Sequence, residues 1–315
     1  MSFSWKYKKL WWKVYKYLEI HTPVKPKKKK YNGKAIKASA DTNEYLAKLV
    51  RSGEPFCAAR IGGSELKAIV SCQPENTNIE EKKYHHNLLY CLSGFCDPYE
   101  RLDDFSRLME KSIGDVDLMC VWFNQMEDVI IGRYGARELE LGVLEGLEPW
   151  YNASNPWTKE LAGKKVLVIH PFKDSILKQY EKRAKLFPGT DILPEFELKC
   201  VKAVQTLLGE ADERARVSWF DALDKMTEEA LAQDFDIALI ACGAYGLPLA
   251  ARLKNAGKQA VHVGGALQLL FGIRGKRWDD FELLKPFYSE AWQYPLDSEH
   301  LSNSNNSSIE NGCYW

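Results

Sequence analysis

At 315 residues, with 45% apolar and 27% charged residues, the chain has the composition of a soluble protein and can bury a large core. Its net charge of zero hides an asymmetry, because residues 1–34 hold eleven lysines and one glutamate, a formal +10, which leaves −10 for the rest. No stretch approaches the roughly 20 apolar residues of a membrane-spanning helix, and no signal-peptide pattern follows the early lysines. The eight dispersed cysteines lack zinc-ligand spacing, which predicts reduced thiols in a cytoplasmic protein.

The N-terminal stretch predicts a basic amphipathic helix. Apolar side chains recur at helical spacing while lysines repeat on another face; the apolar set is Phe3, Tyr7, Leu10, Trp11, Val14 and Leu18. This pattern is typical of a helix that lies on an anionic membrane, at the inner face in a cytoplasmic protein. The alternative is that the aromatic stripe packs on the protein's own body. Residues 21–34, with two prolines and a lysine run, predict a flexible linker that extends the basic surface over residues 3–34.

The folded domain is predicted over residues 35–300, after the helix and linker of residues 1–34 and before a polar tail at 301–315. A helix at 41–53 precedes a buried strand at 56–60, which ends in Arg60. Gly62 and Gly63 form a turn, and Ser64 begins a helix that carries Glu65 in its first turn. Residues 79–113 are predicted helical, 117–123 a strand, and 132–150 a helix with a following loop. Because this domain is acidic, no nucleic acid is expected as a partner.

The second half alternates strands and helices, which predicts a doubly wound, mostly parallel, Rossmann-like α/β sheet. A strand at 165–169 leads into His170 and Lys173, and a helix at 175–187 follows. A short extended piece precedes Glu195, and another helix covers 219–233. The segment 234–278 then gives a strand at 237–242, a helix through 253 and a strand at 260–263. Its glycines and basic residues are Gly243, Gly246, Gly264, Gly265, Arg274, Lys276 and Arg277.

The glycines at these strand ends point to a phosphate-bearing ligand. In parallel sheets ligands sit at the carboxyl ends of the strands, where glycines let backbone amides approach a phosphate. The GAYG turn at 243–246 lacks the GxGxxG spacing, and Walker, GxSxG and HExxH motifs do not occur. Arginine and lysine after the last strand fit a diphosphate leaving group. The alternative is that the glycines only form turns and the basic cluster is solvated.

Two stretches together carry a resemblance: RIGGSEL at 60–66 and DIALIACGAYGLPLAARLKNAGKQAVHVGG at 236–265. They resemble the glycosyltransferases of the GT-D fold, a bacterial family of domains of unknown function that includes nucleotide-sugar transferases. That family has R-F-G-D-G-E after its first strand, and Arg60, Gly62 and Glu65 match it. Gly63 stands in place of the family's aspartate, so a divalent Mn²⁺ or Mg²⁺ is left open, with Glu65 as the only candidate ligand. The stretch from His170 to Trp278 also resembles bacterial proteins associated with surface-polysaccharide genes.

The resemblance implies a glycosyltransferase that moves a sugar from a nucleotide-diphosphate donor to a hydroxyl of a glycan or lipid-linked acceptor. Glu65 would be the base or a metal ligand, Arg60 would orient it, and His170 is the third catalytic candidate. The expected binding residues are Gly62, Gly63, Lys173, Glu195, Gly243, Tyr245, Gly246, Arg274, Lys276 and Arg277.

Two other functions are weighed beside this one. A non-catalytic module could bind a nucleotide or polyanion while the basic helix tethers it to a membrane. A different transferase acting on polysaccharide, for example one that moves pyruvyl groups, also fits the context.

Overall fold

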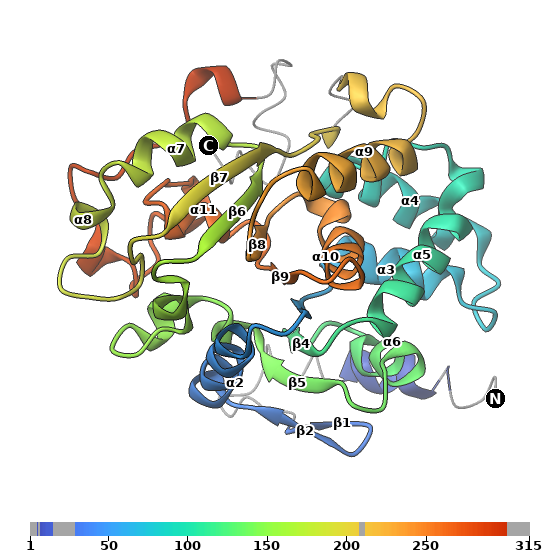
Figure 1. The fold of residues 1–315 in the computed structure, drawn as a ribbon. Helices are drawn as coiled ribbons and strands as arrows, with labels where there is room; N and C mark the ends of the chain where they lie inside the picture. Colours follow the sequence, from blue (N-terminus) through green and yellow to red (C-terminus); the bar gives the residue numbers. More distant parts are fainter. Residues whose placement is uncertain (1–4, 6, 15–28, 208–211, 301–315) are drawn as a thin grey trace.

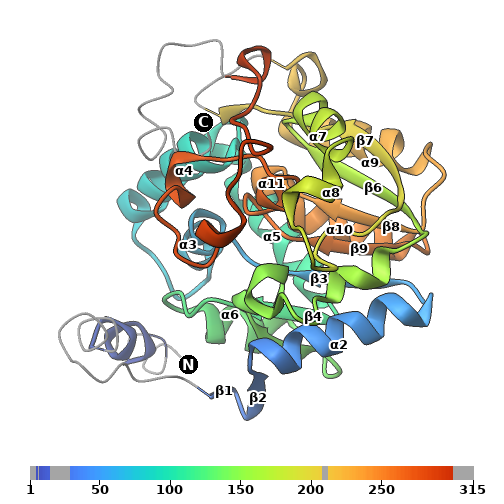
Figure 2. The ribbon, with the colours of Figure 1, turned by 90° about the vertical axis from the view of Figure 1, so that its left-hand side faces the viewer.

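The computed structural model describes residues 5, 7–14, 29–207 and 212–300 and shows a nine-stranded sheet with helices on both faces (Figures 1 and 2). The strand order is β1-β2-β5-β4-β3-β9-β8-β6-β7; β1 pairs antiparallel with β2 and all other neighbours are parallel. In that order the strands are β1 (Lys30–Tyr31), β2 (Lys34–Lys37), β5 (Glu140–Val143), β4 (Leu118–Val121), β3 (Phe56–Ala59), β9 (Gln259–His262), β8 (Ile237–Ile240), β6 (Lys165–His170) and β7 (Glu197–Lys202). The mostly parallel α/β sheet predicted from the sequence is therefore confirmed.

The central strands are continuous apolar runs because both of their faces are buried. Along β3, Cys57 and Ala59 belong to one hydrophobic core, and Phe56 and Ala58 belong to the core on the other face. β3 joins the two halves of the sheet, since Ala58 pairs with Leu118 of β4 on one side and with Val261 of β9 on the other.

The helices are divided between the two faces by the direction in which the chain crosses the sheet. Connections toward the β1 edge run over the face that holds Cys57, and connections toward the β7 edge run over the opposite face, as right-handed crossovers require. The first face is covered by α3 (Gly63–Cys72), α4 (Ile79–Ser93), α5 (Leu102–Gly114), α6 (Glu127–Tyr134), α9 (Trp219–Leu231) and α10 (Gly246–Asn255). The second face is covered by α2 (Ser39–Ser52), α7 (Lys173–Tyr180), α8 (Arg183–Leu186), α11 (Leu267–Leu270) and 3₁₀ turns after β5.

This arrangement opens a crevice at the carboxyl edge of the sheet. The chain leaves β8 toward α10 on one face and leaves the neighbouring β6 toward α7 on the other. Loops that diverge in this way from adjacent parallel strands leave space for a ligand between them.

Three predicted elements differ from the structure. The helix predicted within 132–150 is wrong, because α6 ends at Tyr134 and residues 140–143 form β5, which pairs with β4 and buries Leu141 in the core. The helix predicted at 79–113 is divided where Gly94 adopts a φ of 76°. The extended piece expected before Glu195 lies after it, as the edge strand β7.

The linker predicted through Lys34 is also wrong at its end, because residues 30–37 form the β1–β2 hairpin and β2 joins the main sheet. Within the described residues no helix has the length and apolarity needed to cross a membrane. The predicted tail at 301–315, and residues 15–28 of the predicted helix and linker, lie outside the described residues.

The N-terminal segment presents tryptophans in two environments. Residues 7–14 are helical, and Trp5 and Trp12 are buried against the body, where the Trp12 indole N–H donates to Asp128 at 2.8 Å. Trp11 and Leu10, in contrast, are about half exposed, at 49% and 59%. The described members of the predicted apolar stripe are therefore all on the exposed side, and the docked side is formed by Trp5 and Trp12, which the stripe did not include. Phe3 and Leu18 of the stripe lie outside the described residues.

Candidate functional site

A cavity of 390 Å³ lies at the carboxyl edge of the sheet. Its walls come from residues at or after the carboxyl ends of seven parallel strands, so segments far apart in the sequence meet there. The polar and charged residues that line it include Arg60, Ser64, Glu65, Glu148, His170, Thr206 and Arg277. Its volume falls in the range of small-molecule sites.

Arg60 follows β3 and brings positive charge into the cavity. Its guanidinium lies over the indole of Trp122, 5.0 Å from the ring centroid, and that ring is fixed by a 2.8 Å hydrogen bond from its N–H to the Ile61 carbonyl. The Arg60 Nε is buried, and the described part of the chain offers it no hydrogen-bond acceptor. A buried guanidinium donor without an acceptor is costly, so this geometry is suited to an anionic ligand.

Glu65 lines the cavity at the start of α3 and is only 6% exposed. The Ser64 hydroxyl donates to its Oε2 at 3.0 Å, and a Cβ built on Gly62 would lie 1.9 Å from the same oxygen. The carboxylate therefore folds back over the N-cap residue Gly62, as in a capping box. A side chain at position 62 would displace the Glu65 carboxylate, so the glycine in the RIGGSEL turn allows Glu65 to take this position.

The start of α10 forms the opposite wall. Gly243, with a φ of +57°, packs against the backbone of Ser93, and Tyr245 stacks on Trp219 with ring centroids 4.4 Å apart. A Cβ on Gly246 would lie 2.2 Å from Nε2 of His262, so this glycine lets α10 approach the end of β9. The N-termini of α3 and α10, each ten residues long, thus converge on one cavity and favour negative charge there.

His170 lies at the end of β6 and is 3% exposed. Its Nδ1 accepts a hydrogen bond from the Phe172 backbone N–H at 2.9 Å, which leaves the ring proton on Nε2. Burial lowers the His170 pKa to about 3, so the ring is neutral at physiological pH. It can donate a hydrogen bond to a ligand, whereas Nδ1 is already committed to the backbone.

Glu148 is a site residue that the sequence prediction missed. It follows β5, lines the cavity and is partly buried. Burial raises the pKa of its carboxyl to about 7, and the nearby charges of Arg60 and Arg277 act in the opposite direction. The sequence does contain a pattern that could have indicated it: apolar residues alternate over residues 139–143, as in a strand, and Glu148 follows this strand.

Five predicted binding residues do not line this cavity, and one of them is Gly246, the first residue of α10, which packs against His262. Glu195 precedes β7, at the opposite edge of the sheet, and pairs with Arg183. Arg274 pairs with Asp279 at 2.9 Å and lies over the rings of Tyr288 and Tyr294, and Lys276 is exposed, so only Arg277 of the basic triplet lines the cavity.

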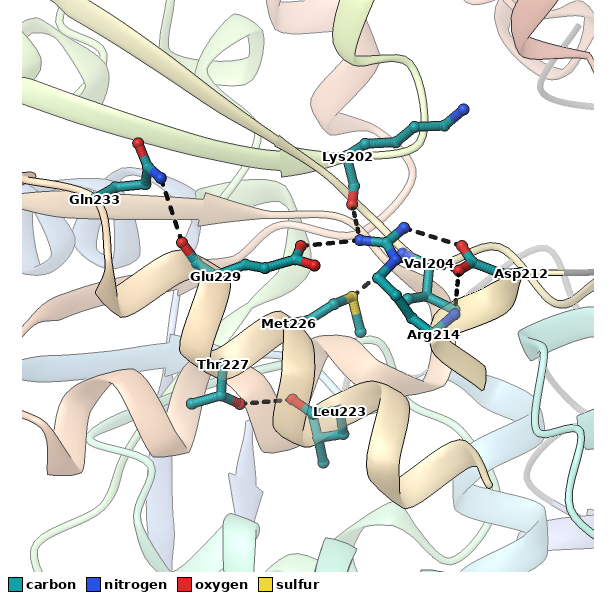
Figure 3. Close-up of polar contacts among 9 residues, drawn as sticks. All are labelled: Lys202, Val204, Asp212, Arg214, Leu223, Met226, Thr227, Glu229 and Gln233. Carbon is teal, nitrogen blue, oxygen red and sulfur yellow. Dashed lines mark hydrogen bonds and ion pairs between the residues drawn. The ribbon is translucent and has the colours of Figure 1, made fainter. Parts of the chain in front are cut away.

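Lys173 lies at a second, separate groove beside the edge strand β7, with Lys202 and Arg214. Figure 3 shows Arg214 held by Asp212, Glu229 and the Lys202 carbonyl, which fastens the segment after β7 to α9. The arginine of this groove is therefore already neutralised by the protein's own carboxylates.

The donor set of the cavity does not fit a divalent metal. Gly63 contributes no side chain, and Glu65 already accepts from Ser64. Across the described ranges, no three His, Cys, Asp or Glu side chains are grouped as metal ligands. Arginine is the cation that the residues present supply.

No family model matches the chain, and no curated protein matches its sequence. Among solved structures the chain is similar to two of a domain of unknown function 1792, one described as having a distinct glycosyltransferase fold and one substituted with selenomethionine. Each likeness covers 84% of this chain and 92% of the other, at 14% sequence identity, with TM-scores of 0.39 and 0.37. At these scores the likeness supports no conclusion about function, so a functional proposal has to rest on the geometry of the cavity.

Proposed function

We propose that the chain is a nucleotide-sugar-dependent glycosyltransferase of the GT-D type. The observation that supports it best is the Arg60 guanidinium, whose buried Nε faces no acceptor among the described residues, in a cavity where two helix N-termini meet. A diphosphate supplies the acceptor oxygens and the negative charge that this arrangement favours. Gly62, Gly63, Gly243 and Tyr245 would form the walls around it.

The reaction follows from the charges in the cavity. When an acceptor hydroxyl attacks the anomeric carbon, the leaving nucleoside diphosphate gains negative charge. Arg60 and Arg277 are placed to stabilise that charge, and the neutral His170 can donate a hydrogen bond to a sugar or phosphate oxygen. Glu65, held at the start of α3, would accept a hydrogen bond from a sugar hydroxyl.

Calorimetry with UDP, GDP, ADP and CDP tests the proposal. At least one should bind wild-type protein, and Arg60→Lys should weaken that binding about 10–100-fold, because lysine loses the fork and the stacking on Trp122. Arg252→Lys is the matched control, since Arg252 pairs with Asp224 on the surface. If none of the four binds, the glycosyltransferase proposal is wrong; binding without hydrolysis or transfer of any sugar donor would favour the non-catalytic module.

The N-terminal segment supports a proposal on location. Tyr7, Leu10, Trp11 and Val14 follow helical spacing and are each about half exposed or more, beside lysines of a segment rich in positive charge. We propose that this surface contacts anionic lipids and holds the enzyme near a glycan or lipid-linked acceptor at the inner face of a membrane.

A further inference from the structure

Glu148 is held in the cavity by the loop that follows β5. Its carbonyl accepts from the backbone N–H of Tyr151 at 3.2 Å, which closes a 3₁₀ turn, and Leu144 from the same loop lines the cavity beside it. The loop packs through Leu147 and Trp150 into the core between the sheet and α2. The carboxylate is therefore positioned by a rigid part of the fold.

Charged groups from three elements surround this carboxylate. Arg60 comes from the end of β3 and Arg277 from the segment after α11, and both favour its ionised form. Glu145, one turn earlier on the same loop, opposes ionisation of Glu148, while the Trp150 indole favours it. Burial raises the pKa of the Tyr151 phenol, and the Glu148 charge raises it further. Burial outweighs the favourable groups and sets the Glu148 pKa near neutrality, at about 7.

The other carboxylate of the cavity is engaged differently. Glu65 receives the Ser64 hydroxyl and lies over Gly62 at the start of α3, so it already has a structural partner. At Glu148 the Trp150 indole N–H acts as a hydrogen-bond donor, which leaves further lone pairs of the two carboxylate oxygens for a ligand. A group that must take a proton during catalysis needs lone pairs that face the reactants and a pKa close to the working pH.

We propose that Glu148 receives the proton of the acceptor hydroxyl. The inference rests on the glycosyltransferase function proposed above. As the O–H proton moves to a Glu148 oxygen, the hydroxyl oxygen forms the new bond to the anomeric carbon. The bond between that carbon and the diphosphate oxygen breaks, and its electron pair leaves on the nucleoside diphosphate, where Arg60 and Arg277 offset the added charge.

The same geometry couples diphosphate binding to proton uptake. Arg60 and Arg277 keep the Glu148 pKa lower than burial alone would set it, and a bound diphosphate neutralises both of them. The Glu148 pKa then rises, and a carboxyl that is about half protonated at pH 7 takes up as much as about half a proton.

Calorimetry at pH 7 in two buffers of different ionisation enthalpy measures this uptake, with whichever nucleoside diphosphate of the panel binds. Wild-type protein should take up a fraction of a proton and Glu148→Gln none. Glu145→Gln is the matched control, because it removes a carboxylate from the same loop and should retain the uptake. An equal uptake in Glu148→Gln would overturn the inference.

Turnover provides the second readout, as release of the nucleoside diphosphate from a sugar donor. Glu148→Gln should lower kcat about 10²–10⁴-fold and remove the rise of kcat/KM with pH near 7. Glu148→Asp should keep that rise at reduced rate, and thermal melting should show that each variant folds. If wild-type protein binds no nucleoside diphosphate, the proposed function fails and the inference with it. If binding is intact and Glu148→Gln keeps its rate and pH profile, the inference alone fails.

Discussion

The ideal Cβ position on Gly264 lies 2.5 Å from the Nε of Arg60, so a side chain at Gly264 and the observed Arg60 position exclude each other. Gly264 follows β9 and Arg60 follows the neighbouring β3, and the glycine adopts a φ of +80°. The glycine is thus needed twice, for its left-handed backbone and for the space that the guanidinium occupies. The Arg60 guanidinium thus lies between the Gly264 backbone and the face of the Trp122 ring.

Gly264→Ala should therefore damage the site more than the fold. We expect a loss of about 1–2 kcal/mol in the free energy of unfolding from the left-handed backbone, together with at least a tenfold weaker binding of the nucleoside diphosphate. Gly257→Ala is the matched control, because Gly257 has a φ of +83° and nothing within 4 Å of its ideal Cβ. Denaturant unfolding and calorimetry separate the effects; equal affinities for the two variants would show that Arg60 does not depend on Gly264.

The basic cluster after α11 should divide by function. Arg277→Gln is expected to weaken diphosphate binding about tenfold, because its charge reaches the cavity. Arg274→Gln should leave affinity unchanged and lower only stability, since Arg274 joins Asp279 to the rings of Tyr288 and Tyr294. Calorimetry and thermal melting of the two variants check this; the reverse pattern would mean that Arg274 turns into the site when a ligand binds.

Most of the sheet could be predicted from the sequence because its strands are buried on both faces and therefore read as apolar runs. The same rule brought Arg60, Glu65, His170 and Gly243 together, since each lies at or after the end of a parallel strand and parallel strands end at one edge. β5 was not predicted because its four residues lie among helix-favouring leucines and glutamates, and they form a strand only through pairing with β4. Glu148 was missed with it.

The wrongly placed binding residues fail for a different reason. Lys173 does follow the β6 strand end, but as the first residue of α7 it lies at the groove beside β7, outside the cavity. Glu195 precedes its strand, so it lies at the amino edge. The direction in which a side chain points, and the residue at which a strand begins, depend on tertiary contacts that the local sequence does not encode.

Glu127 makes stability depend on pH. It is fully buried at the start of α6, where one oxygen accepts from the Tyr31 hydroxyl at 3.0 Å and from the Phe123 backbone N–H at 2.9 Å. Burial raises its pKa from 4.5 to about 7. The folded state therefore binds more protons than the unfolded state between these values, so stability is gained below the unfolded pKa and lost as pH rises toward 7.

Glu127→Gln should remove this dependence, because glutamine resembles the protonated acid and carries no charge to bury. Between pH 5 and pH 8 the free energy of unfolding should fall by roughly 3 kcal/mol less in the variant than in wild-type protein. Urea unfolding at the two pH values measures it, with Glu138→Gln on the exposed surface as the control. Parallel curves for Glu127→Gln and wild-type protein would place the titration elsewhere, for example on Glu148, whose pKa is also about 7.

The two sides of the N-terminal helix should respond differently to substitution. Leu10 and Val14 are 59% and 50% exposed on the side away from Trp12, which is 1% exposed. Leu10→Glu with Val14→Glu should reduce sedimentation with anionic vesicles at least tenfold without lowering the melting temperature, because the change removes apolar contact and adds repulsion at a solvated surface. Trp12→Phe, which loses the hydrogen bond to Asp128, should instead lower stability and leave sedimentation unchanged.

Binding to anionic vesicles should also weaken with salt, whereas neutral vesicles should bind poorly at all salt concentrations. If the double variant sediments like wild-type protein, the exposed side does not contact lipid and residues 5–14 only stabilise the body.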